Sequence, residues 1–322
     1  MIEIKEHIAL APYTSVKIGG PARFFVEVST EDELKEAAAW AKEKKLPVAV
    51  LGAGSNVLIA DTGFDGLVIH SQIKTITFED DRMHVGAGVM MAAAAHAALA
   101  RNVSGFEWAI GIPGTIGGSV YGNAGCFGGE MKDVVEHVRV LQISNFKFQI
   151  SDLSQNECIF KYRESIFKKN KNWIILGATI KLKRVSDEEK KDKQLWIQQM
   201  MWERVAEQAI GERTMGSTFK GILLTDDLQR HIQRYDRRFQ KPERACWVFE
   251  NRRGMLSAGF LIERAELKGK KIGGVFVSPK HANFLINDGM AISEHVVMLI
   301  AYIKEHVHRK FGIMLEEEIQ YL

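Results

Sequence analysis

The sequence contains few cysteines and no long hydrophobic run, and these absences exclude several classes of protein. Only Cys126, Cys158 and Cys246 are present, an odd and sparse set that neither crosslinks a secreted fold nor spaces the ligands of a zinc site. The longest apolar stretch, residues 296 to 303, is far too short to span a bilayer, and residues 1 to 7 lack the pattern of a signal peptide. We therefore expect a cytoplasmic protein with free thiols, no metal site and no membrane partner.

An excess of charge of one sign is also nearly absent, because 43 Lys and Arg oppose 40 Asp and Glu. The whole excess lies in residues 221 to 256, which carry eight basic residues against five acidic ones. Such a patch can attract an anionic small molecule, although a solvated basic face is the commoner explanation. The acidic residues within the patch disfavour a nucleic-acid partner. A hydrophobic content of 46% is sufficient for a substantial core.

Two glycine-rich segments are the most informative feature of the chain. The first follows an apolar strand and reads Gly52, Ala53, Gly54, Ser55, Asn56. Glycine reaches positive φ and lets peptide N–H groups approach anionic oxygens, so this segment can bind a diphosphate. A surface turn has the same composition, and this segment alone does not decide between the two.

The second segment, residues 111 to 125, contains six glycines and no charged side chain. Because Ile, Val and Tyr accompany the glycines, we interpret it as buried backbone folded around a large flat group. Two such segments suggest an extended dinucleotide. Neither segment has the spacing of the GxGxxG fingerprint, which argues against an ordinary NAD domain.

Local patterns predict an α/β protein. Thr30 and Glu33 form a capping box at the start of a helix. The predicted helices span residues 30–44, 90–100 and 293–311, and a further helix ends near residue 209. The predicted strands lie within residues 22–28, 47–51, 66–70, 74–89, 138–150 and 173–184. The charged stretch from residue 183 to 193 indicates a domain boundary.

Eight short strings, in this order along nearly the whole chain, resemble the UDP-N-acetylenolpyruvoylglucosamine reductase (MurB) family. They are Thr14–Ala22, Leu51–Leu58, Glu107–Gly118, Tyr162–Lys168, Gly216–Lys220, Ala258–Glu263, Lys280–Phe284 and Leu315–Ile319. The resemblance implies an FAD-binding fold of the vanillyl-alcohol-oxidase type. It also implies two FAD-binding subdomains, residues 1–70 and 71–186, and a C-terminal α/β substrate-binding domain, residues 187–322.

The resemblance further implies NADPH-dependent reduction of UDP-N-acetylglucosamine enolpyruvate through noncovalent FAD, in peptidoglycan precursor synthesis and hence in cell wall formation. The resemblance assigns both glycine-rich segments to cofactor binding. The implied cofactor residues are Gly52, Ala53, Gly54, Ser55, Asn56, Gly111, Pro113, Gly114, Thr115, Gly117, Gly118, Gly122 and Asn123.

Three residues match the catalytic positions of that family. Arg163 would hold the substrate carboxylate, because its guanidinium can donate two parallel hydrogen bonds. Ser217 would donate a proton to the carbon beside that carboxylate, and Glu318 would polarise the carboxylate. If the segment is a strand, Glu316 lies on the same side as Glu318 and is the rival assignment.

Further residues of these motifs are candidates for binding substrate. They are Tyr162, Lys220 and His281, and Asn283 is a plausible loop ligand.

The chain departs from the family pattern after Lys220, where about thirty residues look inserted. The insertion contains Arg230, His231, Arg234, Tyr235, Arg237, Arg238, Phe239, Lys241 and Arg244. It is either a lid that binds the phosphates of NADPH or of the UDP-sugar, or a helical surface excursion. Two alternatives to the reductase stay open: a flavin oxidase of the same fold, and a family member that binds flavin or nucleotide without turnover.

Overall fold

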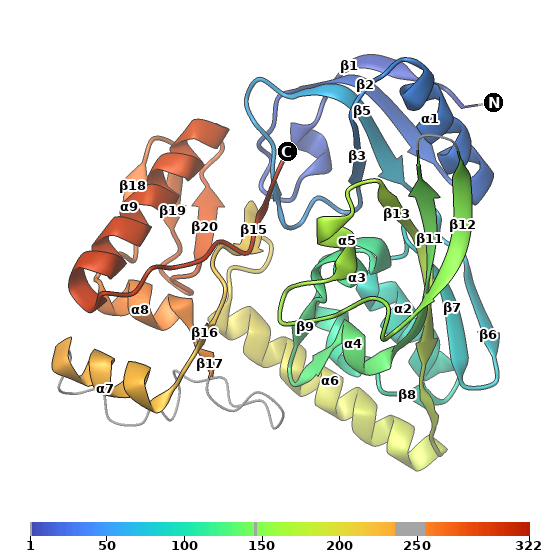
Figure 1. Cartoon of the computed structure of the whole chain (residues 1–322). Helices are drawn as coiled ribbons and strands as arrows, with labels where there is room; N and C mark the ends of the chain where they lie inside the picture. The colour runs from blue at the N-terminus through green and yellow to red at the C-terminus, as the bar shows by residue number, and fades with distance from the viewer. Residues whose placement is uncertain (1, 145–146, 236–254) are drawn as a thin grey trace. The chain divides into compact units, whose positions relative to one another are not determined.

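The computed structural model describes residues 2–144, 147–235 and 255–322. The chain divides into two compact units, and each is built from separate stretches of sequence (Figure 1). Unit 1 comprises Met1–Ala9, Pro21–Gly54 and Gly63–Arg204, and unit 2 comprises Leu10–Gly20, Ser55–Thr62 and Val205–Leu322. The finer division into subdomains 1–70 and 71–186 followed by a domain 187–322 stays a prediction.

Unit 1 begins with a four-stranded sheet in the order β1 (Lys5–Ala9), β2 (Pro21–Val28), β5 (Phe64–Ser71), β3 (Val48–Leu51). The strands β2, β5 and β3 are parallel, and helix α1 (Glu31–Glu43) follows β2. Thr30 accepts a hydrogen bond from the Glu33 N–H at 3.1 Å while the Glu33 carboxylate accepts from the Thr30 N–H. The predicted capping box is therefore confirmed; such caps contribute about 1 kcal/mol.

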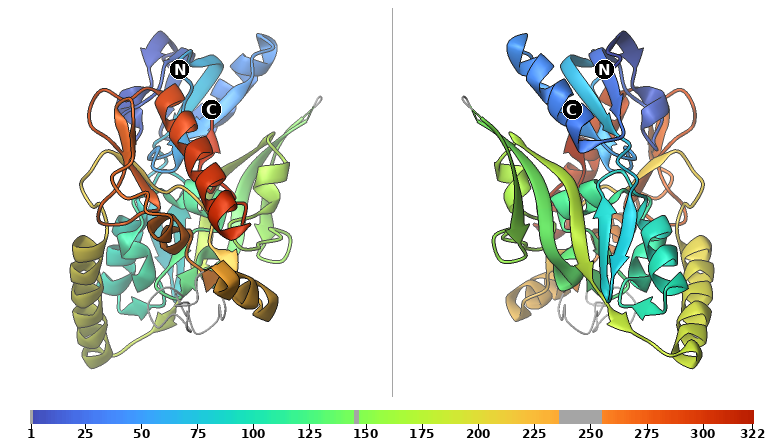
Figure 2. Two further views of the ribbon diagram at one scale, coloured as in Figure 1. Left: turned by 90° about the vertical axis from the view of Figure 1, so that its left-hand side faces the viewer. Right: turned by 90° about the vertical axis from the view of Figure 1, so that its right-hand side faces the viewer.

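A second sheet in unit 1 is antiparallel throughout. Its order is β12 (Phe148–Ser154), β11 (Val135–Ile143), β13 (Trp173–Lys181), β7 (Arg82–Gly86), β6 (Ile76–Glu79). Helix α3 (Ile116–Gly122) packs against β13 and β7 on one face of this sheet (Figure 2), and helix α2 (Met91–Ala100) contributes to the same hydrophobic core. The strands and the helix predicted here are thus present.

Helix α6 (Asp187–Glu207) closes unit 1. The charged stretch from residue 183 to 193 forms β14 (Lys183–Arg184) and the first turns of α6, and the units divide between Arg204 and Val205. Ile197 and Met200 of α6 are buried in the core of unit 1. The shorter elements of this unit are β8 (Val103–Ser104), η2 (Glu107–Gly111), β9 (Gly125–Cys126), β10 (Gly129–Glu130), α4 (Met131–Val134) and α5 (Ile166–Lys169).

Unit 2 contains a sheet in the order β15 (Thr214–Ser217), β20 (Phe284–Asn287), β19 (Val275–Val277), β18 (Lys271–Ile272). Helix α9 (Ser293–Phe311) has the predicted bounds, and α8 (Ala258–Arg264) packs against it. Two N-terminal stretches complete this core, because Val16, Ile18 and Leu58 are buried in it. They carry η1 (Ala11–Tyr13) and β4 (Val57–Leu58), and β4 pairs in parallel with β21 (Gln320–Tyr321).

The described part of the insertion belongs to unit 2. Strand β16 (Ile222–Leu223) pairs with β17 (Met255–Leu256), and helix α7 (Asp226–Tyr235) between them packs against α9. Ile232 of α7 is fully buried, and His231 Nε2 lies 2.7 Å from the carbonyl oxygen of Phe311 at the end of α9. This half of the insertion is a packed helix. The residues from Arg237 to Arg244 of the lid hypothesis lie outside the described residues.

Within the described residues, no helix has both the length and the apolar character that a membrane crossing requires.

Candidate active site

Tyr162 and Arg163 form the tip of a tight turn in unit 1. Lys161 and Glu164 exchange two backbone hydrogen bonds of 3.0 Å across it, and Arg163 has a φ of 57°. A left-handed conformation costs a residue other than glycine about 1–2 kcal/mol. The Arg163 Nη2 donates to the carbonyl of Gly125 at 3.1 Å, and Lys168 Nζ donates to the carbonyl of Arg163 at 2.7 Å. Neighbouring contacts thus hold a strained turn, as is typical of functional sites.

The second glycine-rich segment is joined to this turn. Asn123 is completely buried, and its Nδ2 donates to the carbonyl of Lys161 at 2.9 Å and to the Glu130 carboxylate at 3.0 Å, while its Oδ1 accepts from the Lys132 N–H. The Ser165 hydroxyl donates to the carbonyl of Tyr121 at 2.6 Å. The side chain of Asn123 therefore uses its amide to connect the glycine-rich segment with the turn that carries Arg163.

The two glycine-rich segments meet at Gly52. A Cβ atom at this position would lie 2.3 Å from the Thr115 hydroxyl oxygen, so only glycine allows this approach. Gly54 has a φ of +60°. Within the described part of the chain, the backbone N–H groups of Ala53 and Ser55 make no hydrogen bond. They are available to anionic oxygens, as a phosphate-binding loop requires.

Helix α3 presents a surface without side chains. Thr115 caps it by accepting from the Gly118 N–H at 3.4 Å. Gly118 and Gly122 are four residues apart and so share a face of the helix. A Cβ at Gly122 would meet no atom within 4 Å, and one at Gly118 would meet only the Thr115 hydroxyl, at 3.7 Å. At Gly117, in contrast, a Cβ would lie only 2.9 Å from the Cβ of Ala87. This open face suits a flat ring system.

Arg204 was not found by sequence reasoning, because a single arginine near the end of a helix matches no motif. Its guanidinium packs against Gly111, where a Cβ would lie 2.2 Å from Nη1. Burial lowers the pKa of Arg204, and the adjacent Cys126 only partly opposes this effect. Its Nε is buried and has no hydrogen-bond partner among the described residues. Of the other candidate residues in this segment, Pro113 is exposed and Gly114 is buried.

Ser217 lies in unit 2 at the end of β15, directly after a β-bulge. Thr214 pairs with Ile286 and Ser217 with Phe284, so β15 has one more residue than β20 over this interval. Gly216 supplies the extra residue with a φ of +75°. Bulges of this kind redirect the next side chain and are common beside active sites.

Asn283 holds the segment that follows Ser217. Its Oδ1 accepts from the Phe219 N–H at 2.9 Å and its Nδ2 donates to the Phe219 carbonyl at 2.8 Å, while its own carbonyl accepts from the Thr218 N–H. Both Asn283 and Phe219 are buried. The sequence suggests Asn283 as a loop ligand, whereas in the structure its side-chain amide binds the Phe219 backbone.

The glutamate run pairs with this same segment. The Glu318 N–H donates to the Thr218 carbonyl and the Lys220 N–H to the Glu316 carbonyl, both at 2.8 Å. Phe219 and Glu317 form the bridge between these bonds. In this ladder Glu318 lies opposite Thr218, which directly follows Ser217, and the Glu318 carbonyl accepts from Asn56 Nδ2 at 3.2 Å.

The other two glutamates have lysine partners in unit 2. Glu316 is 76% exposed and lies 3.5 Å from Lys220 Nζ. Glu317 accepts from Lys304 Nζ at 2.8 Å and from the Tyr321 hydroxyl at 2.5 Å. Glu318 is half-buried whereas Glu316 is exposed, and this difference favours Glu318 as the reacting carboxylate.

His281 is half-buried near the same loop. Its Nδ1 lies 3.3 Å from the Asn283 N–H, and its ring contacts Phe284 at a centroid distance of 4.7 Å.

The sequence-predicted residues therefore fall into two groups. Unit 1 holds Tyr162, Arg163 and the glycine-rich residues up to Gly54 and from Gly111 to Asn123; unit 2 holds Ser55, Asn56, Ser217, Lys220, His281 and Glu318.

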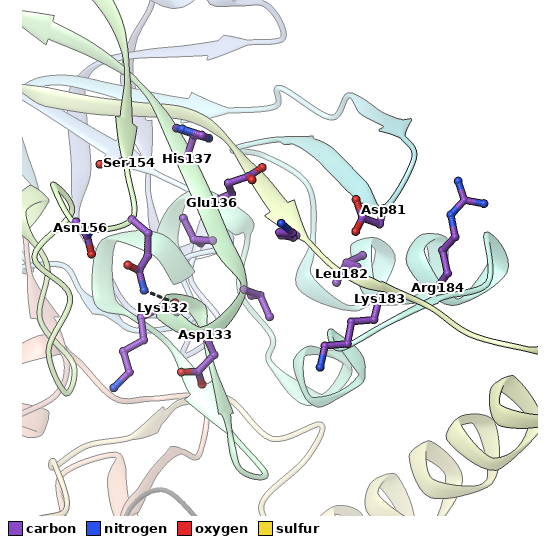
Figure 3. A pocket seen from close by; sticks show the side chains of 14 residues that line it. Asp81, Lys132, Asp133, Glu136, His137, Ser154, Asn156, Leu182, Lys183 and Arg184 are labelled. Atoms are coloured by element: carbon purple, nitrogen blue, oxygen red, sulfur yellow. Dashed lines mark hydrogen bonds between the residues drawn. The ribbon is translucent and has the colours of Figure 1, made fainter.

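A broad cleft of about 840 Å³ in unit 1 contains none of these residues (Figure 3). Its walls carry both signs of charge, with Lys132, Lys183 and Arg184 beside acidic groups such as Asp81. Arg82 binds Glu136 of this wall through two hydrogen bonds of 2.6 and 2.9 Å, and these bonds lower the pKa of Glu136. With balanced charge and paired groups, this cleft is not the candidate site. No group of three potential metal ligands occurs among the residues that the structure describes.

Two family models match separate parts of this chain. Residues 22–145 match the family model described as "FAD binding domain", and residues 208–322 match "UDP-N-acetylenolpyruvoylglucosamine reductase, C-terminal domain". The chain is 38% identical to the reductase of that name from Caldanaerobacter subterraneus, over 96% of this chain and 90% of the relative. The chain belongs to the UDP-N-acetylenolpyruvoylglucosamine reductase family. It is therefore an FAD-containing oxidoreductase, as the sequence resemblance implied.

Two further members of this reductase family match over nearly their whole length. The reductase of Clostridioides difficile is 34% identical over 99% of this chain and 93% of its own. The crystal structure of the UDP-N-acetylenolpyruvylglucosamine reductase (MurB) from Thermus caldophilus superimposes with a TM-score of 0.74 at 27% identity, over 100% and 99% of the two chains. The predicted fold class, α/β with the FAD-binding fold, is confirmed.

The residues present fit FAD. The two unengaged N–H groups of the first segment suit a diphosphate, and the open glycine face of α3 suits the flat isoalloxazine.

Proposed function

We propose that this chain reduces UDP-N-acetylglucosamine enolpyruvate to UDP-N-acetylmuramate with NADPH, through noncovalent FAD, in the cytoplasm. The observation that carries the proposal is the ladder between residues 218–220 and 316–318, because it brings the segment of Ser217 beside Glu318. A proton donor and a carboxyl group at neighbouring positions are what an enolpyruvyl reduction requires. UDP-N-acetylmuramate is a precursor of peptidoglycan.

FAD would be held by the two glycine-rich segments. The proposed ligands are Gly52, Ala53, Gly54, Ser55 and Asn56 in the first segment and Gly111, Pro113, Gly114, Thr115, Gly117, Gly118 and Gly122 in the second, with Asn123 positioning the second. FAD held there would supply hydride transfer from NADPH to the vinyl carbon of the substrate.

Arg163 is proposed to bind the substrate carboxylate. Negative charge develops next to this carboxylate as hydride adds to the vinyl carbon, so a fixed cation stabilises the transition state more than the ground state. The Gly125 carbonyl of β9 accepts a hydrogen bond from the guanidinium and holds it in place, which limits reorganisation during the reaction. Tyr162, Lys220 and His281 are proposed to bind the remainder of the substrate.

Ser217 is proposed to donate the proton that completes the reduction. A hydroxyl is a weak acid, but a carbanionic or enolate centre is a strong base, so the transfer runs downhill once the two atoms meet. Glu318 is proposed to hydrogen-bond the substrate carboxylate and to favour the enol form. The β-bulge before Ser217 and the ladder to Glu318 hold these two residues in register.

The experiment separates the two half-reactions under anaerobic conditions. NADPH should bleach the flavin absorbance of the purified protein, and the enolpyruvyl sugar nucleotide should restore it. Ser217→Ala should leave bleaching unchanged and slow the restoration by about 100-fold or more. Ser151→Ala, a serine of β12 in unit 1, is the matched control and should change neither step.

Each of the two alternative functions predicts a different result in this experiment. A flavin oxidase would not be bleached promptly by NADPH, and a family member without turnover would not be restored by the substrate. Equal slowing of both half-reactions in Ser217→Ala would exclude the proton-donor role.

A further inference from the structure

The glutamate run poses a positioning problem, because only the last of its three adjacent carboxylates, Glu318, is proposed to react. The three glutamates belong to one extended segment, which pairs with residues 218–220, directly after Ser217. Along such a strand adjacent side chains point to opposite sides, so the partner of Glu317 determines how Glu318 is presented.

Glu317 is bound on both of its oxygens. Lys304 Nζ, from helix α9, lies 2.8 Å from Oε1, and the Tyr321 hydroxyl donates to Oε2 at 2.5 Å. The side chains of Glu317 and Lys304 are only 22% and 31% exposed, so water competes weakly for this ion pair. Burial alone would raise the pKa of Glu317, but the hydrogen bonds from Lys304 and Tyr321 outweigh it and hold this pKa below its ordinary value.

The ion pair connects the strand to a rigid element. Lys304 lies within α9, whose Ile300, Ile303 and Val307 are buried in the core of unit 2. The Glu317 backbone bridges Phe219, and the next N–H donates to Thr218. Through its ion pair with Lys304, the Glu317 side chain thus connects the strand that carries Glu318 to helix α9.

We propose that Lys304 and Tyr321 are positioning residues for this reaction, acting through Glu317 to hold Glu318 beside Ser217. This inference rests on the proposed function, since it names residues that act on the same site. Neither residue contacts the reacting groups in the structure; both act by fixing the strand.

The test compares Lys304→Met with Lys310→Met in the full-length, FAD-loaded protein. Lys310 is also on α9, where its Nζ donates to the Arg264 carbonyl and lies 3.6 Å from the exposed Glu266, so it is a matched control. Lys304→Met should make the amide of Glu318 exchange hydrogen about tenfold faster. It should also slow flavin restoration by the enolpyruvyl substrate about tenfold, with bleaching by NADPH unchanged. Lys310→Met should change none of these rates.

A double-mutant cycle separates positioning from general stability. In a Glu318→Gln background, Lys304→Met should slow restoration no further, because the residue through which it acts is already changed. Lys304→Arg, which retains a donor for Glu317, should restore most of the rate, and Tyr321→Phe should have a smaller effect of the same kind.

Two results would overturn the inference. One is amide exchange in Lys304→Met equal to that in Lys310→Met; the other is slowing by Lys304→Met of the same size with and without Glu318. If the wild-type flavin is not bleached by NADPH or not restored by substrate, the proposed function fails instead. The exchange rates then still decide whether Lys304 holds the strand.

Discussion

Replacing Asn283 by alanine tests how the Ser217 segment is held. The substitution removes the acceptor of the Phe219 N–H and the donor to the Phe219 carbonyl, which lie at 2.9 and 2.8 Å in a region where Phe219 is 1% exposed. A buried polar group left without a partner costs about 1–3 kcal/mol. Since two groups lose their partner and water can enter the vacated space, we expect a loss of about 2–4 kcal/mol in the free energy of unfolding.

The assay is urea denaturation followed by fluorescence, together with the anaerobic half-reactions. With an m-value of about 2–3 kcal/mol/M, the midpoint should fall by about 1 M. Flavin restoration by substrate should slow while bleaching by NADPH does not, because Phe219 is two residues from Ser217. Asn172→Ala, at an exposed turn of unit 1, is the control and should stay within about 0.5 kcal/mol of wild type.

An unchanged midpoint with an unchanged m-value in Asn283→Ala would refute the reasoning. It would mean that the Phe219 backbone groups do not depend on this amide.

Three further predictions concern single residues. Gly216→Ala should destabilise the protein by about 1–2 kcal/mol in urea unfolding, because its φ of +75° strains alanine although no atom blocks the Cβ; an unchanged midpoint would contradict the bulge geometry. The pKa of Glu317 is lowered in the folded state, so its stabilisation is present above the ordinary value of 4.5 and is lost as pH falls through the folded-state pKa. The difference in unfolding free energy between wild type and Glu317→Gln should therefore shrink on acidification below pH 4.5. A difference that grows on acidification would contradict a lowered pKa of Glu317. Burial raises the pKa of Cys158 to about 12, so iodoacetamide at neutral pH should label this thiol, by mass spectrometry, only after unfolding; equal labelling of folded protein would show that it is accessible.

Local sequence patterns predicted most of the secondary structure. The apolar spacing of residues 293–311 gave α9 with its observed bounds, and Thr30 with Glu33 marked the start of α1. These signals succeed because periodicity and capping act between residues a few positions apart. The charged stretch from residue 183 to 193 is interpreted from the sequence as a boundary, and its second part forms the first turns of α6, because a solvated helix carries as much charge as a linker.

The sequence motifs propose residue types for the candidate site but carry no information on its geometry. The motifs indicated Ser217 and Glu318, yet the bulge at Gly216, the amide of Asn283 and the pairing of Glu317 with Lys304 join distant parts of the sequence. No local pattern encodes them, since each depends on which strands become neighbours. The same holds for Val16, Ile18 and Leu58, whose burial in unit 2 only the folded chain reveals.

The interleaved path of the chain has a consequence for synthesis on the ribosome. Residues 10–20 and 55–62 emerge early, but the core that covers them is completed by residues 205–322, which emerge last. We therefore expect apolar side chains such as Leu58 to stay exposed to solvent during most of translation. A shortened gene that begins at codon 205 would yield a polypeptide lacking these pieces, and we expect it to aggregate unless the missing peptides are supplied alongside.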